Sequence, residues 1–290
     1  MELKLKRLNL ELSAHCSYAC VGCPNTYMER KKGHMSLESF KQIYDEIEGE
    51  VERVFLWNYG EPLINPEIAE IINYTSNKKP RTVLSTTGVT LSFKNDLSFL
   101  GVLDELIISV NGFDPETYSF HQKKGDFTKV IAGLEKLRVV MEKADTEYVL
   151  QTVVNSKNVY QIAEAEQFAR KYGFDKVVFK SFNVMDSKTE TESQFVPTKF
   201  KFSRKNSADK TNKMYPCLEW MVINWNGDVN VCCWDYEGKI ILGNVLEQGV
   251  IGVWESEKMD GLKERLSGEK ILSYCGKCTV KTTLEERVIK

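Results

Sequence analysis

Three of the eight cysteines lie within the stretch SAHCSYACVGCPNT, residues 13–26. Cys16, Cys20 and Cys23 have the spacing C-x3-C-x2-C. A short loop with these spacings can bring three thiolates to three corners of a polynuclear iron–sulfur cluster, which leaves the fourth iron without a protein ligand. An open coordination position is typical of a catalytic site, whereas a closed set of ligands is structural. The alternative is a zinc site that takes a fourth ligand such as His15.

A second group of cysteines lies near the C-terminus. Four of them have the spacing of a closed thiolate set: Cys217, Cys232, Cys275 and Cys278. Gly227 lies between the first two, in the pattern C-x9-G-x4-C, and the last two form C-x2-C. Four thiolates suit either an iron–sulfur cluster or a structural zinc ribbon. Cys233 is left over, as a small buried hydrophobic residue, an alternative ligand or a hydrogen-atom donor near the substrate.

Apolar, β-branched stretches alternate with amphipathic stretches over the first two thirds of the chain. The pattern predicts strands over 5–13, 51–60, 81–88, 105–112, 147–155 and 176–182. It predicts helices over 35–50, 65–77, 96–103, 127–143 and 159–173, with Ser36 as an N-cap and Gly173 as a C-terminal stop. Six strand–helix units favour a parallel sheet with right-handed crossovers, and therefore an α/β fold with a partial (β/α)6 barrel. Ligands then bind at the carboxyl ends of the strands.

The alternation stops after the last predicted strand. We expect a barrel domain over 1–186, a linker or mouth loop over 187–213, and a small cluster-binding domain over 214–290. The polar, aperiodic middle segment suits a loop. The tail contains two short strands about an Asn-Gly turn, which is a strong hairpin signal, followed by a helix over 252–269.

Composition bounds the function classes. The chain has 290 residues, 42% hydrophobic content and a net charge of −2. It has no basic run that would follow a nucleic acid backbone, and no apolar run of the ~18 residues that a membrane span needs. The N-terminus alternates charged and apolar residues, unlike a signal peptide. We therefore expect a cytoplasmic protein with reduced thiols, whose cysteines bind metal or act in catalysis.

A C-x3-C-x2-C loop after the first strand of a partial barrel resembles the radical SAM superfamily. The resemblance implies that Cys16, Cys20 and Cys23 hold a 4Fe–4S cluster, and that its open iron binds the amino and carboxylate groups of S-adenosylmethionine. Reduction then gives a 5′-deoxyadenosyl radical, which abstracts hydrogen from the substrate. The family usually has an aromatic residue before the third cysteine, where this chain has Gly22 and offers Tyr18 within the loop to cover the adenine.

Further strand ends resemble the cofactor-binding segments of the same family. WNYGEPL resembles the Gly-Gly-Glu-Pro element, whose backbone pairs with the amino group of the cofactor. STTG and ISVNGFDPETY resemble the polar segments after the third and fourth strands. The cofactor-binding residues that the resemblance implies are Tyr59, Gly60, Glu61, Pro62, Ser85, Thr87, Ser109, Asn111 and Asn155. The alternative is that these residues form ordinary turns and cap the following helices.

The cysteine spacing of the tail resembles the SPASM extension of radical SAM enzymes, in its shortened twitch form. That resemblance implies that Cys217, Cys232, Cys275 and Cys278 hold one auxiliary 4Fe–4S cluster. Such a cluster can take an electron from a substrate radical, which gives a net two-electron oxidation. One twitch enzyme oxidises the secondary alcohol of 2-deoxy-scyllo-inosamine, and CPNTYMERKKGHMS and NYGEPL are similar in style to it.

The sequence therefore predicts a radical SAM oxidoreductase for a small molecule of sugar or cyclitol type. A flavodoxin or ferredoxin is implied as electron donor. No general base is assigned: Lys180 on the last strand is a candidate if its side chain points into the barrel mouth, and the alternative is a lysine that faces outward. One alternative is a ribosomal-peptide maturase, although the first cysteine comes too early for an N-terminal peptide-recognition domain. Another is a non-catalytic metal-binding or redox-sensing protein. A twitch enzyme that acts on GTP is disfavoured because the chain ends in EERVIK rather than in an arginine–glycine tail.

Overall fold

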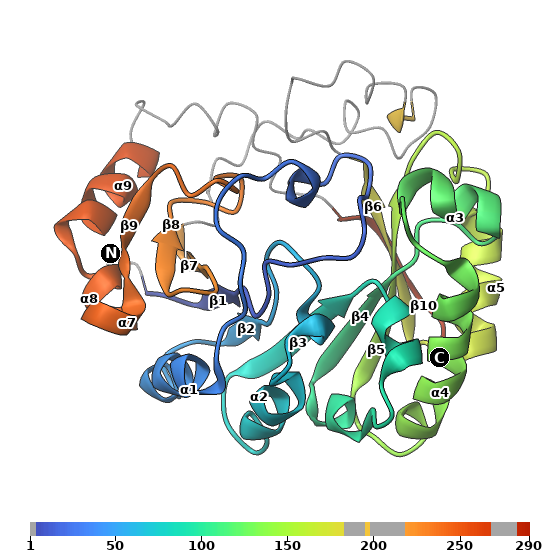
Figure 1. Cartoon of the computed structure of the whole chain (residues 1–290), viewed down its shortest axis with the longest axis horizontal. Helices are drawn as coiled ribbons and strands as arrows, with labels where there is room; N and C mark the ends of the chain where they lie inside the picture. Colours follow the sequence, from blue (N-terminus) through green and yellow to red (C-terminus); the bar gives the residue numbers. More distant parts are fainter. Residues whose placement is uncertain (1–3, 183–194, 198–217, 268–282) are drawn as a thin grey trace. The chain divides into compact units, whose positions relative to one another are not determined.

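Strands and helices alternate along the chain in the computed structural model (Figure 1), which describes residues 4–182, 195–197, 218–267 and 283–290. The chain divides into two compact units. The first contains Met1–His15, Tyr27–Val83 and Lys210–Val280, and the second contains Cys16–Thr26, Leu84–Asp209 and Lys281–Lys290.

The sheet of the first unit joins barrel strands to the C-terminal hairpin. Its strands are β1 (Arg7–Leu10), β2 (Arg53–Phe55), the first half of β3 (Arg81–Thr86), β7 (Trp220–Ile223), β8 (Asp228–Asn230) and β9 (Ile241–Asn244). They lie in the order β3-β2-β1-β7-β8-β9. The pairs from β3 to β7 are parallel, and β7, β8 and β9 are antiparallel. The Asn-Gly turn between β7 and β8 is confirmed, and Gly227 there has a left-handed φ of +86°.

The described part of the first unit also contains six helical segments. They are α1 (Leu37–Glu46), η2 (Pro62–Ile64), α2 (Ile68–Tyr74), α7 (Val245–Gln248), α8 (Val250–Trp254) and α9 (Glu257–Ser267). Ser36 caps α1 as predicted, since its side chain accepts a hydrogen bond from the Ser39 amide. The carboxylate of Glu46 accepts from the first amides of α8, which ties the C-terminal helices to α1.

The second unit holds the remaining strands. These are β4 (Glu105–Ser109), β5 (Glu147–Val154), β6 (Lys176–Ser181) and β10 (Thr283–Val288). β4, β5 and β6 are parallel, and β10 pairs with β6 in the antiparallel direction. Helical segments are η1 (Pro24–Thr26), η3 (Val89–Phe93), η4 (Ser98–Val102), α3 (Pro115–His121), α4 (Phe127–Met141) and α5 (Ile162–Tyr172). Gly173 ends α5 in the left-handed conformation, as predicted.

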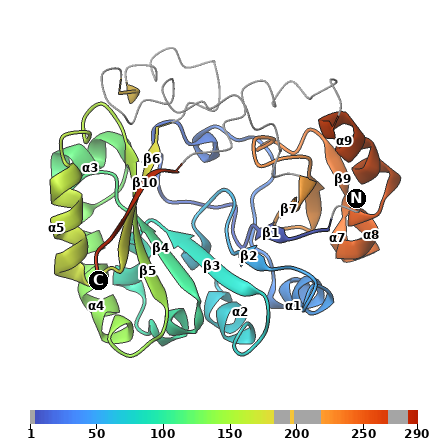
Figure 2. The same cartoon turned by 180° about the vertical axis from the view of Figure 1, so that it is seen from behind.

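One face of β5, β6 and β10 packs against α5 (Figure 2). Arg287 of β10 forms an ion pair with Glu166 of α5, and it lies opposite Val177 in the register with β6. Because side chains alternate along a strand, Val177 and Phe179 point toward the same helix. Both are buried. Val178 and Lys180 therefore belong to the other face of the sheet.

Three differences from the sequence-based prediction have local causes. β2 ends at Phe55 rather than at Gly60, because the following residues turn. Segment 96–103 forms the 3₁₀ helix η4 rather than an α-helix. The helix α3 was not predicted, although Asp114 caps it and Pro115 occupies its first turn. Most of 187–213 lies outside the described residues, so the domain boundaries there stay a prediction. None of the helices in the described part of the chain is long and apolar enough to cross a membrane.

Candidate functional site

Backbone hydrogen bonds fix the cysteine loop that follows β1. The Ala19 amide donates to the carbonyl of Lys123 at 2.9 Å, and the Val21 amide donates to the carbonyl of His121 at 2.9 Å. Within the loop, the Cys23 amide donates to the carbonyl of Cys20 at 3.1 Å. These main-chain bonds hold the loop against the end of α3 and the turn that follows it.

The conformation of Gly22 explains why no aromatic residue precedes the third cysteine. Its φ is +78°, in the left-handed region that non-glycine residues rarely adopt. Tyr18 is buried, and its hydroxyl lies 2.6 Å from that of Tyr118, with the two rings edge to face. Tyr18 therefore anchors the loop against α3.

The donor set of the loop suits an iron–sulfur cluster. Cys16, Cys20 and Cys23 are partly exposed, and none is in a disulfide. Within the described ranges, no group of three or more His, Cys, Asp or Glu side chains gathers around a position for one metal ion. A cluster distributes its thiolate ligands over separate irons, so three sulfurs need not converge on one point. The residues present fit a cluster better than a single zinc ion.

The turn after β2 packs its main chain against the segment that leads into the cysteine loop. Gly60 has a φ of +108°, and a Cβ atom there would overlap the carbonyl oxygen of Ser13 and lie 2.8 Å from that of His15. The Glu61 amide donates to the His15 carbonyl at 2.8 Å. The side chain of Glu61 is buried and accepts from the Leu63 amide, where it caps η2. Glycine is required here because the two backbones touch.

Glu11, directly after β1, is a buried acid that joins three segments of the first unit. Its carboxylate accepts from Arg30 at 2.5 Å, from the Tyr59 amide at 3.3 Å and from the Trp225 amide at 3.4 Å. Burial raises the pKa of Glu11, although Arg30 and the two amides act in the opposite direction. Sequence reasoning missed this residue. The available signal was an acid between two apolar residues, Leu10 and Leu12, which are both buried.

The segment around Cys232 is bonded to the same turn and to Arg30. The Tyr59 hydroxyl donates to the carbonyl of Cys233, and Arg30 Nε donates to the carbonyl of Tyr236 at 2.7 Å. A side-chain hydrogen bond with Cys233 lowers the pKa of Cys232, which is partly exposed. The other three predicted auxiliary ligands, Cys217, Cys275 and Cys278, lie outside the described residues.

The polar residues at the end of β4 support neighbouring backbone. Ser109 Oγ accepts from the Gln151 side chain at 3.1 Å. Asn111 Oδ1 accepts from the Val153 amide at 2.7 Å, and Asn111 is buried. These bonds hold the ends of β4 and β5 together.

The remaining predicted strand-end residues differ in exposure. Ser85 and Thr87 are partly exposed near the end of β3. Asn155 is buried, and its Oδ1 accepts from the amides of Lys157 and Asn158, which closes the turn after β5. Its Nδ2 lies 3.5 Å from Nδ1 of His121, and burial lowers the pKa of that histidine to about 4.

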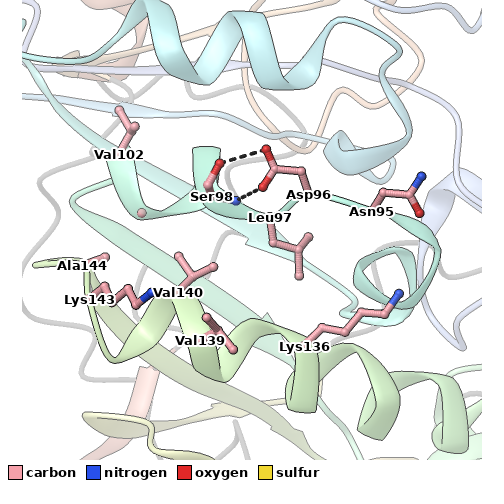
Figure 3. A pocket seen from close by; sticks show the side chains of 11 residues that line it. Asn95, Asp96, Leu97, Ser98, Val102, Lys136, Val139, Val140, Lys143 and Ala144 are labelled. Carbon is pink, nitrogen blue, oxygen red and sulfur yellow. Dashed lines mark hydrogen bonds between the residues drawn. The ribbon is translucent and has the colours of Figure 1, made fainter.

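A pocket of about 670 Å³ lies between η4 and α4, and none of the predicted site residues lines it (Figure 3). Leu97 and two residues of α4, Val139 and Val140, form its apolar part. Lys136 of α4 and Lys143, just after the helix, also line it. Asp96 accepts from both the amide and the hydroxyl of Ser98, which closes the turn on the opposite side. The pocket contributes no residue to the cysteine sites.

Comparisons with known families match both parts of the chain. Residues 10–165 match the radical SAM superfamily, and residues 216–279 match the SPASM family, an iron-sulfur cluster-binding domain. The AdoMet-dependent heme synthase of Methanosarcina barkeri is 23% identical over 93% of this chain and 87% of its own length.

Solved structures show the same fold. BtrN in complex with AdoMet and 2-DOIA is 17% identical, with a TM-score of 0.54 over 92% of this chain and 88% of BtrN. SuiB of Streptococcus suis bound to the precursor peptide SuiA is 14% identical, with a TM-score of 0.66 over 90% of this chain and 67% of SuiB. The expected fold class, an α/β fold with an open, partial barrel, is confirmed by these matches.

Proposed function

Because this chain belongs to the radical SAM superfamily, we propose that it is an oxidoreductase that removes a hydrogen atom and then an electron from a small molecule of sugar or cyclitol type. The cofactors of the two matched domains are S-adenosylmethionine with its 4Fe–4S cluster, and an auxiliary iron–sulfur cluster. When bound and reduced, they supply a 5′-deoxyadenosyl radical and an electron acceptor.

The protein's part is to hold these groups and to orient the substrate. Cys16, Cys20 and Cys23 hold the first cluster, on a loop whose position is fixed by backbone bonds. Cys232 belongs to the auxiliary set, together with Cys217, Cys275 and Cys278. The hydrogen bond with Cys233 favours the thiolate form of Cys232, which is the form that ligates iron.

The turn from Tyr59 to Pro62 orients the amino group of the cofactor through its main chain. Its backbone is rigid because Gly60 rests on Ser13 and the Glu61 amide is bonded to His15. The strand-end residues Ser85, Thr87, Ser109, Asn111 and Asn155 complete the cofactor site in this proposal. In both Asn111 and Asn155, the side-chain oxygen Oδ1 already accepts a hydrogen bond from a backbone amide.

One observation carries the assignment of an oxidation. The turn of residues 59–62 is bonded directly to the cysteine-bearing segment, through the Tyr59 hydroxyl and the Cys233 carbonyl. Arg30 adds a second bond to the same segment, at Tyr236. The bond from Tyr59 supports the proposal that an auxiliary cluster on Cys232 lies near the cofactor-orienting turn and accepts an electron from a substrate radical.

The test is an anaerobic iron and sulfide count on the reconstituted protein and on the variant with Cys16, Cys20 and Cys23 all changed to alanine. We expect about eight irons in the wild type and about four in the variant, with loss of dithionite-driven S-adenosylmethionine cleavage. Oxidation is then assayed with 2-deoxy-scyllo-inosamine and related cyclitols. About four irons with zinc in the tail would remove the auxiliary acceptor and the case for oxidation. Absence of cleavage under strong reduction would favour a non-catalytic metal-binding protein.

Ribosomal-peptide maturation is the second candidate. The likeness to SuiB bound to its precursor peptide supports it. Incubation of the reduced protein with candidate precursor peptides, followed by mass spectrometry, separates the two functions. A peptide mass change that requires S-adenosylmethionine, without turnover of cyclitols, would favour the maturase.

We further propose a flavodoxin or a ferredoxin as electron donor, in the cytoplasm, where the thiols stay reduced. Replacement of dithionite by reduced flavodoxin tests the donor. S-adenosylmethionine cleavage that starts with flavodoxin but not with its oxidised form is the expected result.

A further inference from the structure

The sheet of the second unit has a face that is turned away from α5 and that carries both charged and polar side chains. We call it the Lys180 face. By strand alternation and register it comprises Glu105, Ile107, Ser109, Glu147, Val149, Gln151, Val153, Lys176, Val178, Lys180 and Glu286. Lys176 and Lys180 thus lie on one face of β6, four residues apart.

Charges at the amino ends of these strands compensate one another. Lys176 forms ion pairs with Glu147 at 3.0 Å and with Glu286 at 3.6 Å. Burial acts to lower the pKa of Lys176, but its acidic neighbours, Glu147 foremost, raise it above the ordinary value. This end of the face is a closed ionic network and holds its lysine in the charged form.

Lys180 lies near the carboxyl end of β6 and has a different environment. It is level with Val153 of β5 and with the backbone of Thr283 in β10, neither of which carries a charge. Within the part of the chain that the structure describes, its ammonium has no hydrogen bond and no ion pair. Burial lowers the pKa of Lys180, and the carboxylate of Glu105 offsets this only in part. The residue is nevertheless partly exposed.

Polar side chains share the Lys180 face near the carboxyl ends of its strands. The side chain of Gln151 donates to Ser109 Oγ at 3.1 Å on the same face, and Gln151 precedes Val153 by two residues. Carboxyl ends of parallel strands are the positions where α/β proteins bind ligands. Burial of Lys180 costs free energy, and none of the described residues forms a hydrogen bond or an ion pair with its ammonium, so a function explains this lysine better than stability does.

We propose that Lys180 is the proton acceptor in the oxidation, which rests on the proposed function. The substrate loses its C–H hydrogen atom to the 5′-deoxyadenosyl radical, and its hydroxyl proton to Nζ of the uncharged Lys180. Its remaining unpaired electron passes to an iron–sulfur cluster, the one-electron acceptor. One C–H and one O–H bond break, and the C–O bond becomes a carbonyl. The amine becomes an ammonium and returns its proton to solvent.

The first test measures the charge state of Lys180 without turnover. The reconstituted protein is labelled with acetic anhydride at a series of pH values, and labelling of each lysine is quantified by mass spectrometry. Lys143, an exposed lysine beside the pocket of Figure 3, is the internal reference. We expect the labelling of Lys180 to reach its plateau at a lower pH than that of Lys143. A plateau at the same or a higher pH overturns the proposal, as does a failure to label, since a substrate could then not reach the amine.

The second test uses variants. Lys180→Ala should lower kcat with 2-deoxy-scyllo-inosamine by about 10²–10⁴-fold, the usual contribution of a general base. Added ethylamine should restore part of the rate in Lys180→Ala but not in Lys180→Arg, whose guanidinium stays charged. Lys143→Ala is the matched control, and equal iron content establishes that each variant is intact. A kcat of Lys180→Ala near that of the wild type, or no response to ethylamine, contradicts the assignment. If the wild type oxidises no cyclitol, the proposed function fails, and the labelling experiment still decides the state of Lys180.

Discussion

Arg30 donates a hydrogen bond of 2.5 Å to Glu11, whose side chain is completely buried, 19 residues away in the sequence. The pair links the end of β1 to the segment after the cysteine loop. Through the Tyr59 and Trp225 amides, the same carboxylate also holds the turn after β2 and the turn of the C-terminal hairpin. A single buried acid thereby sets the mutual position of three loops within one unit.

Removal of Arg30 should destabilise the protein strongly. Arg30→Met leaves the Glu11 carboxylate buried without its cation, which costs about 3–5 kcal/mol for a buried pair. The double variant Glu11→Gln with Arg30→Met should recover part of the loss, because no charge is then left unpaired. Urea unfolding measures both.

The ion pair of Lys6 and Glu219 is the matched control for this experiment, because its lysine is far more exposed. Lys6→Met should change the urea midpoint little, as is usual for surface pairs. An Arg30→Met variant as stable as Lys6→Met would show that the buried pair does not hold the loops.

Gly60→Ala should prevent assembly of the cysteine site. The added Cβ would overlap the Ser13 carbonyl oxygen, and the φ of +108° strains any side chain in addition. Gly49→Ala is the control, since Gly49 has a φ of +89° and no atom within 4 Å of an added Cβ. We expect Gly49→Ala to cost about 1–2 kcal/mol from the left-handed backbone alone. Gly60→Ala should unfold at a lower urea concentration and retain less iron. Equal effects of the two substitutions would refute the steric explanation.

The stability of the protein should fall as the pH drops below 6.5 because of His121. Burial lowers the pKa of this histidine from 6.5 to about 4, so the folded state binds its proton less tightly than the unfolded state does. Between these values the unfolded chain is protonated and the folded chain is not, which removes about 1.4 kcal/mol per pH unit from the free energy of unfolding. The contribution is fully present above pH 6.5.

Unfolding of the wild type and of His121→Phe at pH 7 and pH 5 isolates this contribution from that of the carboxylates. The wild type should lose more free energy of unfolding between the two pH values than the variant does. Parallel losses would mean that His121 takes up its proton in the folded state as readily as in the unfolded chain.

Tyr59→Phe should loosen the cysteine-bearing segment without unfolding the barrel. The substitution removes the hydrogen bond to the Cys233 carbonyl, worth about 1 kcal/mol, and leaves the edge-to-face contact of the ring with Tyr236. We expect a changed electron paramagnetic resonance signal of the reduced auxiliary cluster. Tyr27→Phe, whose ring also meets Tyr236, is the control. An unchanged signal in Tyr59→Phe would argue against a direct link between the turn and the cluster.

Local patterns predicted most of the elements that position the site. The β-branched stretch of β5, the Ser36 cap and the Asn-Gly turn each depend on neighbours in the sequence, and the structure has them as predicted. The position of Gly60 was predicted from a motif, and its φ and its contact with Ser13 supply the physical reason. The ligand roles of the cysteines stay predictions.

Other features could not be predicted, because they depend on residues far apart in the chain. Glu11 accepts its hydrogen bonds from Arg30 and Trp225 only after folding has brought these distant residues to it. The C-terminal strand β10 pairs with β6 across about a hundred residues, and its charged sequence is not typical of a strand. The contrast between Lys176 and Lys180, four residues apart on one strand, depends on acids supplied by β5 and β10.

The contact between residues 13–15 and the turn at Gly60 and Glu61 consists of main-chain atoms. Because main-chain atoms form this contact, it cannot be restored by side-chain substitutions in another protein. Anyone who grafts the cysteine loop onto another barrel must therefore transfer the entry segment and the turn together, as one cassette with a fixed spacing. The same holds for recombination between relatives. A crossover between residues 15 and 60 would combine an entry segment and a turn whose main chains come from different proteins.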